Sequence, residues 1–100
     1  MKKDLFNNKY DDVVLLSKIL SHPARVLILE LLTQKDECVG DIVKHLPLSQ
    51  STISEHLKEL KEAKILLSKT VANKNYYCVD KKQLNKIYND FISRMNEIVL

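Results

Sequence analysis

The sequence contains little that would interrupt a helix, with one glycine and two prolines among its 100 residues. Because these two residue types most often mark turns and helix ends, their scarcity predicts long helices joined by few turns. No apolar run approaches the length that is needed to span a bilayer. Arginine is also scarce, since the basic side chains are almost all lysine and guanidinium groups occur only at Arg25 and Arg94.

Cysteine is rare as well, because only Cys38 and Cys78 are present. The start of the chain shows no apolar segment typical of a signal peptide. We therefore expect a cytoplasmic protein whose thiols are reduced by default.

The overall composition is that of an ordinary soluble globular protein, with 45% hydrophobic and 29% charged residues. A chain of this length, without repeats or linkers, is expected to form one domain over residues 1–100. The net charge of +3 permits binding to nucleic acid but does not establish it. We find no paired carboxylates, Ser-His-Asp set, glycine-rich phosphate loop or metal cluster, so we do not expect an enzyme.

Apolar periodicity and capping residues predict five helices. Ser21 or His22 can cap the second helix, in which Pro23 lies in the first turn and the apolar run 26–32 forms the centre of the core. Pro47 ends the third helix and Ser49 opens the fourth. The other ranges that we predict as helical are 10–20, 41–46, 50–63 and 82–98.

Three short strands are predicted between these helices. A very short strand is expected at 37–39, and residues 65–71 and 75–80 are rich in β-branched and aromatic residues. The segment between the latter two contains Asn73 and Asn75, either of which can adopt the left-handed conformation of a hairpin turn. The order predicts a mainly α fold with a small β-hairpin, namely a winged helix-turn-helix.

The stretch "LSQSTISEHLKEL" at residues 48–60 combines a helical pattern with many hydrogen-bonding side chains. Ile53, Leu57 and Leu60 share one face, which we expect to pack on the core. Capping alone explains Ser49, and His56 lies at the edge of the apolar face, where a half-buried supporting role is expected. Candidate DNA contacts on the helix and the hairpin are Gln50, Ser51, Thr52, Ser54, Glu55, Lys58, Lys61, Lys69 and Lys74.

Three segments together resemble the winged-helix repressors of the arsenic-responsive (ArsR) family: "LSHPARVLILELL", "CVGDIVKHLPLSQSTISEHLKELKEAKIL" and "NYYCV". The resemblance covers about residues 13–80 and implies a repressor that binds double-stranded DNA and responds to an effector. Glu55 departs from the family pattern, where a basic or neutral polar residue is usual. This departure, with the modest charge, supports an alternative function as a protein-interaction module with weak or no DNA binding.

The resemblance also implies a homodimer, formed by the first and last helices. The apolar stripe of the last helix is too wide to pack on one small domain, which favours the same conclusion. The expected interface residues on this helix are Leu84, Ile87, Tyr88, Phe91 and Met95. A two-fold dimer predicts a palindromic operator.

Both metal sites of the ArsR family lack donors in this sequence. Metal-responsive members carry C-V-C where this chain has Cys38, Val39 and Gly40, and one thiolate cannot chelate a soft ion. The last helix contains no histidine. We therefore expect neither a metal site nor another cofactor.

The two cysteines carry one further hypothesis. If Val39 and Val79 point inward, Cys38 and Cys78 share the outer face of a small sheet, where a disulfide could act as a redox switch. The alternative is that they are two unrelated cytosolic cysteines.

Overall fold

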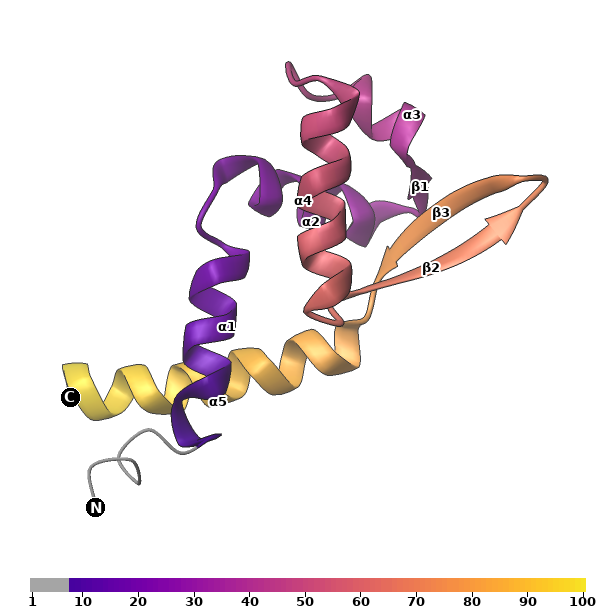
Figure 1. Ribbon diagram of the computed structural model, residues 1–100. Coiled ribbons are helices and arrows are strands. Elements are labelled where there is room, and N and C mark those ends of the chain that lie inside the picture. The colour runs from indigo at the N-terminus through magenta and orange to yellow at the C-terminus, as the bar shows by residue number, and fades with distance from the viewer. Residues whose placement is uncertain (1–7) are drawn as a thin grey trace.

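The computed structural model describes residues 8–100, and residues 1–7 of the expected domain lie outside this range. The elements in chain order are η2 Asn8–Tyr10, α1 Asp11–Ile19, α2 Pro23–Gln34, β1 Glu37–Cys38, α3 Val39–Val43, α4 Gln50–Glu62, β2 Leu66–Val71, β3 Lys74–Val79 and α5 Lys81–Val99. This arrangement confirms the predicted winged helix-turn-helix (Figure 1). The strands and the helices α1, α4 and α5 differ from the expected bounds by at most one residue at each end, whereas α3 differs by two residues at its start and three at its end.

Helix α2 lies at the centre of the core, as its apolar run predicts. Ile28 is fully buried, and Leu29 and Leu32 are buried beside it. The helix begins at His22, whose Nδ1 accepts a hydrogen bond of 3.0 Å from the Ala24 amide. Pro23 follows in the first turn, where its missing N–H costs nothing. His22 therefore caps the helix, and Ser21 lies outside it.

Helix α3 occupies residues Val39–Val43, so the predicted range of 41–46 is wrong at both ends. Cys38 is the N-cap, and its thiol donates a hydrogen bond of 3.1 Å to the Asp41 carboxylate. This bond lowers the pKa of the Asp41 carboxyl below its usual value. The chain then continues in tight turns, because the amides of the next three residues bond to carbonyls three positions back.

Strand β1 is tied to the end of α3 through a buried carboxylate. Glu37 is only 2% exposed, and its Oε1 lies 3.6 Å from His45 Nε2. A carboxylate is rarely this buried unless it is paired. The contact therefore joins the sheet to the turn that follows α3.

Helix α4 ends in a Schellman motif with a lysine at the position usually held by glycine. The Ile65 amide bonds to the Leu60 carbonyl, and the Lys64 amide bonds to the Lys61 carbonyl. Lys64 consequently adopts a left-handed conformation, with φ of 62°. A side chain in this conformation is strained by about 1 kcal/mol.

The sheet has the order β1-β3-β2, and all its pairs are antiparallel. Ala72 and Asn73 connect β2 and β3 with φ values of 50° and 66°, which fit a two-residue type I′ turn. The left-handed conformation predicted for Asn73 is thus confirmed. Asn75 instead lies in β3 and pairs with Thr70, whose hydroxyl donates to its side-chain oxygen.

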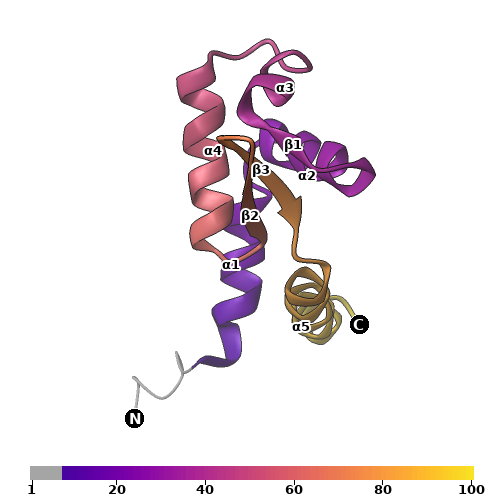
Figure 2. The same cartoon turned by 90° about the vertical axis from the view of Figure 1, so that its right-hand side faces the viewer.

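Helix α5 runs across the base of the domain, and Figure 2 shows it nearly end-on below the sheet. Asp80 caps it by accepting a bond from the Gln83 amide. It packs against α1, where the Lys86 ammonium lies 3.3 Å from an Asp12 oxygen and 3.9 Å from an Asp90 oxygen. Among residues 8–100, no helix is long and apolar enough to cross a membrane.

Candidate nucleic-acid interface

Helix α4 is held by one apolar face and one capping residue. Ile53, Leu57 and Leu60 are each no more than 1% exposed. Full burial of such a side chain contributes about 1.5–3 kcal/mol, so this face fixes the rotation of the helix. Ser49 Oγ accepts a bond of 3.2 Å from the Thr52 amide at the start of the helix.

The opposite face of α4 is polar and exposed to solvent. Gln50, Ser51, Ser54, Lys58 and Lys61 are exposed, as is Glu55, whereas Thr52 is half-buried. The hydroxyls nearest the helix start bond to one another: Ser49 Oγ lies 3.1 Å from Ser51 Oγ and 3.0 Å from Thr52 Oγ1. The side chains of Ser54 and Lys61 form no hydrogen bond or ion pair within residues 8–100, and they stay available to a ligand.

The charged groups on this face are only weakly paired. Lys58 Nζ lies 4.0 Å from Glu62, one helical turn further along. Glu55 forms no ion pair with Lys58 or Lys61 in the described part of the chain. Its carboxylate therefore lies among the candidate DNA contacts with no ion-pair partner from residues 8–100.

The wing carries the two lysines that the sequence singles out, and they differ in their surroundings. Lys69 forms an ion pair of 2.5 Å with Asp36, and this hydrogen bond raises the pKa of the Lys69 ammonium. Lys74 is exposed at the start of β3, beside the turn, and has no ion pair among residues 8–100. Figure 1 shows this turn projecting far from the helices. Lys74 is therefore the freer of the two cations.

His56, in the middle of α4, connects this helix to α2. It is half-buried, and its Nδ1 accepts a bond of 3.1 Å from Arg25 Nε. The His22 ring lies against it, with 4.7 Å between the ring centroids. Burial lowers the pKa of His56, and the nearby His22 and Arg25 lower it further. No local sequence pattern identifies Arg25 as the partner of His56, because the two residues lie 31 positions apart.

The cysteines are not opposite each other in the sheet. Cys38 pairs with Tyr76 and Cys78 pairs with Leu67, so the two cysteines occupy diagonal positions on one face of the β1–β3 pair. Diagonal neighbours lie about 7–8 Å apart, which is beyond the usual reach of a disulfide. Both thiols are free and half-buried in the structure.

The stripe on α5 divides between the core of its own domain and the surface. Ile87 is fully buried, and Leu84 and Phe91 pack partly against the same core. The prediction that Ile87 lies in a dimer interface is therefore wrong, because the domain itself already covers it. Tyr88 is 52% exposed, and Met95 is half-buried.

Within residues 8–100, no group of three or more histidine, cysteine, aspartate or glutamate side chains is placed to hold a metal ion. His22 and His56 lie together but accompany Arg25, whose positive charge disfavours a cation there.

Known proteins resemble this chain in both sequence and fold. The sequence pattern described as "Bacterial regulatory protein, arsR family" matches residues 22–66. The arsenical resistance operon repressor of Staphylococcus xylosus is 32% identical over 90 residues, which cover 90% of this chain and 82% of the relative. The transcriptional repressor SdpR of Bacillus subtilis is also 32% identical, over 80% of this chain and 89% of the relative.

A solved structure with the same fold is the homodimeric winged helix-turn-helix DNA-binding domain Mb0332 of Mycobacterium bovis. It superposes with a TM-score of 0.68 at 21% identity and covers 88% of this chain and 82% of that chain. The sequence matches extend across the helix-turn-helix and well beyond it. This chain therefore belongs to the ArsR family of bacterial regulatory proteins, and it is a winged helix-turn-helix transcriptional regulator rather than an enzyme.

Proposed function

We propose that this protein is a repressor that binds a palindromic DNA operator as a homodimer and acts in the cytoplasm. The observation that carries the proposal is the exposed polar face of α4, fixed in rotation by its buried side and flanked by the wing. In this fold the start of the second helix of the helix-turn-helix, which is α4 here, enters the major groove of DNA.

The residues on α4 divide into two roles. Gln50, Ser51, Ser54 and Glu55 reach base edges, where Gln can pair with adenine and Glu can accept from cytosine. Lys58 and Lys61, with Lys74 on the wing, contact phosphates. Thr52 and Ser49 hold the helix start, and Lys69 stiffens the wing through Asp36 while lying near the backbone of the DNA.

The dimer is supported by apolar side chains that one domain leaves uncovered. On α1 and at its C-cap these include Val14, 65% exposed, and Leu20, 43% exposed, and on α5 they include Tyr88 and Ile92. Exposed apolar groups that adjoin one another mark protein interfaces, and the M. bovis domain is a homodimer. In the proposed interface Tyr88, Ile92 and Met95 lie at the centre, with Leu84 and Phe91 at the edge toward the core.

We further propose that the repressor does not respond to metal ions at the family sites. Gly40 stands where a second thiolate would be required, and a Cβ at this position would have no side chain or other segment of residues 8–100 within 4 Å, apart from its chain neighbours. Cysteine therefore fits at this position without strain. The Gly40→Cys variant should gain stoichiometric Cd²⁺ binding, seen as thiolate-to-metal absorbance, whereas the wild type should show none. Binding of one Cd²⁺ per subunit by the wild type would refute this part of the proposal.

Selection from a randomised duplex pool tests DNA binding. We expect an enriched palindrome whose half-sites lie about 10 base pairs apart. Lys58→Ala should weaken binding to all sequences and reduce the slope of log affinity against log salt by about 1. Ser54→Ala should instead relax the preference at one position of each half-site. Lys82→Ala, at an exposed position of α5, is the matched control. It should change neither the affinity and its salt dependence nor the sequence preference.

Failure to enrich any sequence would contradict the proposal. It would favour the protein-interaction module, for which the unpaired carboxylate of Glu55 and the Lys69–Asp36 pair are the supporting observations.

A further inference from the structure

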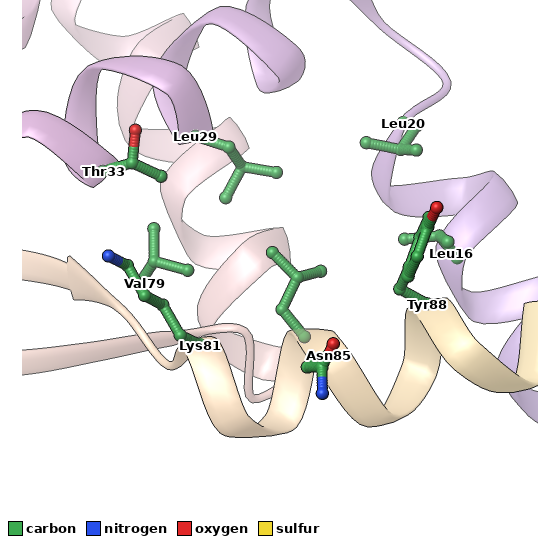
Figure 3. Close-up of a pocket in the computed structure, with 9 residues that line it drawn as sticks. Leu16, Leu20, Leu29, Thr33, Val79, Lys81, Asn85 and Tyr88 are labelled. Carbon is green, nitrogen blue, oxygen red and sulfur yellow. The ribbon is translucent and has the colours of Figure 1, made fainter.

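A cavity of about 410 Å³ lies between α1, α2, the end of β3 and the first half of α5. Figure 3 shows its wall, to which Leu16, Leu20, Leu29 and Val79 contribute. Leu84 of α5 also lines the cavity. Thr33 adds to the apolar wall, because its hydroxyl is already donated to the Glu30 carbonyl at 2.7 Å. The size and the mainly apolar wall are typical of a site for a small organic molecule.

The polar groups lie at the ends of the cavity. Figure 3 places the Lys81 ammonium beside Val79 at the strand end, while Tyr88 stands beside Leu16 at the α1 end. Lys81 is exposed and forms no ion pair with any carboxylate of residues 8–100. Asn85 lies between these two residues along α5. The cavity thus combines an apolar body with one uncompensated positive charge at its rim.

We propose that this cavity binds a small amphipathic carboxylic acid, whose apolar part contacts the leucines and whose carboxylate pairs with Lys81. The apolar wall supplies affinity by excluding water. The single cation selects an anionic head group over a neutral one of the same length.

The cavity connects the two parts of the molecule on which the proposed repression depends. Its wall includes α2, whose Arg25 holds His56 of α4, and α5, which carries Tyr88 of the proposed dimer interface. A ligand that separates α2 from α5 would change the angle between the helix-turn-helix and the dimer helix. As a regulatory site, the cavity rests on the proposed function, whereas ligand binding itself does not.

Octanoate and octan-1-ol serve as the probes, because they share an apolar chain and differ in charge. Both are titrated into the full-length wild-type protein without DNA and followed by methyl NMR. We expect one octanoate per subunit, with the largest shifts at the methyl groups of Leu29, Val79 and Leu84. Octan-1-ol should bind the same site more weakly.

Two variants locate the charge and the cavity. Lys81→Gln should weaken octanoate binding by about fivefold, as expected for one partly exposed ion pair, and leave octan-1-ol unchanged. Lys82→Gln removes an equal charge next to it but outside the wall, and should change neither ligand. Asn85→Phe places a ring over the cavity and should weaken both ligands.

Equal losses of both ligands in Lys81→Gln, or equal effects of the two lysine variants, would overturn the assignment of a carboxylic acid. Unchanged octanoate binding in Asn85→Phe would overturn the site. If sedimentation shows that octanoate converts dimers into monomers, the ligand competes with a second copy of the chain for this face, and the proposed regulation through the angle between α2 and α5 is wrong. DNA selection is carried out without octanoate, and the octanoate titration without DNA. A failure of the proposed DNA binding and a failure of the proposed ligand binding are therefore seen in different experiments.

Discussion

Arg25 Nε donates a hydrogen bond of 3.1 Å to His56 Nδ1, which connects the first turn of α2 to the middle of α4. The same guanidinium donates a second bond, of 2.8 Å, to the Lys18 carbonyl at the end of α1. One side chain therefore joins three helices behind the surface proposed to contact DNA. The bond requires a neutral His56, because a protonated Nδ1 cannot accept.

We predict that this contact makes stability depend on pH in the weakly acidic range. Because the pKa of His56 is lowered from its usual value of 6.5, the unfolded chain binds the proton more tightly than the folded one. The stabilisation is complete above pH 6.5 and decreases as the pH falls through the lowered pKa of the folded state.

Urea unfolding of the wild type and of His56→Gln at pH 7.5 and pH 5.5 measures this effect. Gln retains an acceptor for Arg25 but does not titrate, so its free energy of unfolding should fall less between the two pH values. Asp12 on α1 and Asp90 on α5, which lie beside Lys86, are present in both proteins. Their contribution to the pH dependence therefore cancels in the comparison. An equal fall in both proteins would show that His56 does not carry the dependence.

We predict that Ile92→Lys converts the proposed dimer into a folded monomer. Ile92 is 37% exposed in the single domain, so lysine can be accommodated there, but its charge would be buried in the dimer interface. Light scattering and circular dichroism at micromolar concentration report the two properties. Ser93→Lys adds the same charge to another face of α5 and should remain dimeric. A monomeric wild type, or an unaffected Ile92→Lys, would be inconsistent with the proposed interface.

We predict that Lys64→Gly increases the free energy of unfolding by about 1 kcal/mol, because glycine relieves the left-handed strain after α4. Lys61→Gly, the same exchange within the last turn of the helix, should decrease it, since glycine is a poor helix former. Thermal or urea unfolding gives both values. The two substitutions should have opposite signs, and a loss of stability in Lys64→Gly would contradict the role of the Schellman motif.

We predict that mild peroxide does not form a disulfide between Cys38 and Cys78 within one subunit. Their diagonal positions across β1 and β3 place the Cα atoms too far apart for a bond without movement of the backbone. Intact-mass spectrometry should show no loss of two mass units, and DNA binding should be unchanged. Cys38→Ser and Cys78→Ser are the controls. A loss of two mass units in the wild type, absent from both variants, would establish the disulfide and require a shift of the strand register.

Several features follow from the sequence because they depend on neighbouring residues. Ser49 caps α4, Pro23 opens α2 and Asn73 forms the turn of the wing, since each of these choices is made by local hydrogen bonds or steric limits. The core face of α4 follows from spacing alone, because Ile53, Leu57 and Leu60 recur at the helical period. These signals, with the family motifs, identify the fold and the surface proposed to contact DNA.

Other features are decided only when distant segments meet. Periodicity gives α5 one broad apolar stripe, but packing against α1 and α2 determines that Ile87 belongs to the core and Tyr88 to the surface. Sequence places Cys38 and Cys78 in strands, whereas the register is fixed by how β1 meets β3. The partnership of Arg25 with His56 and the cavity beside Lys81 depend likewise on the angles between helices. Those angles result from the packing of many side chains at once, and no local pattern along the chain encodes them.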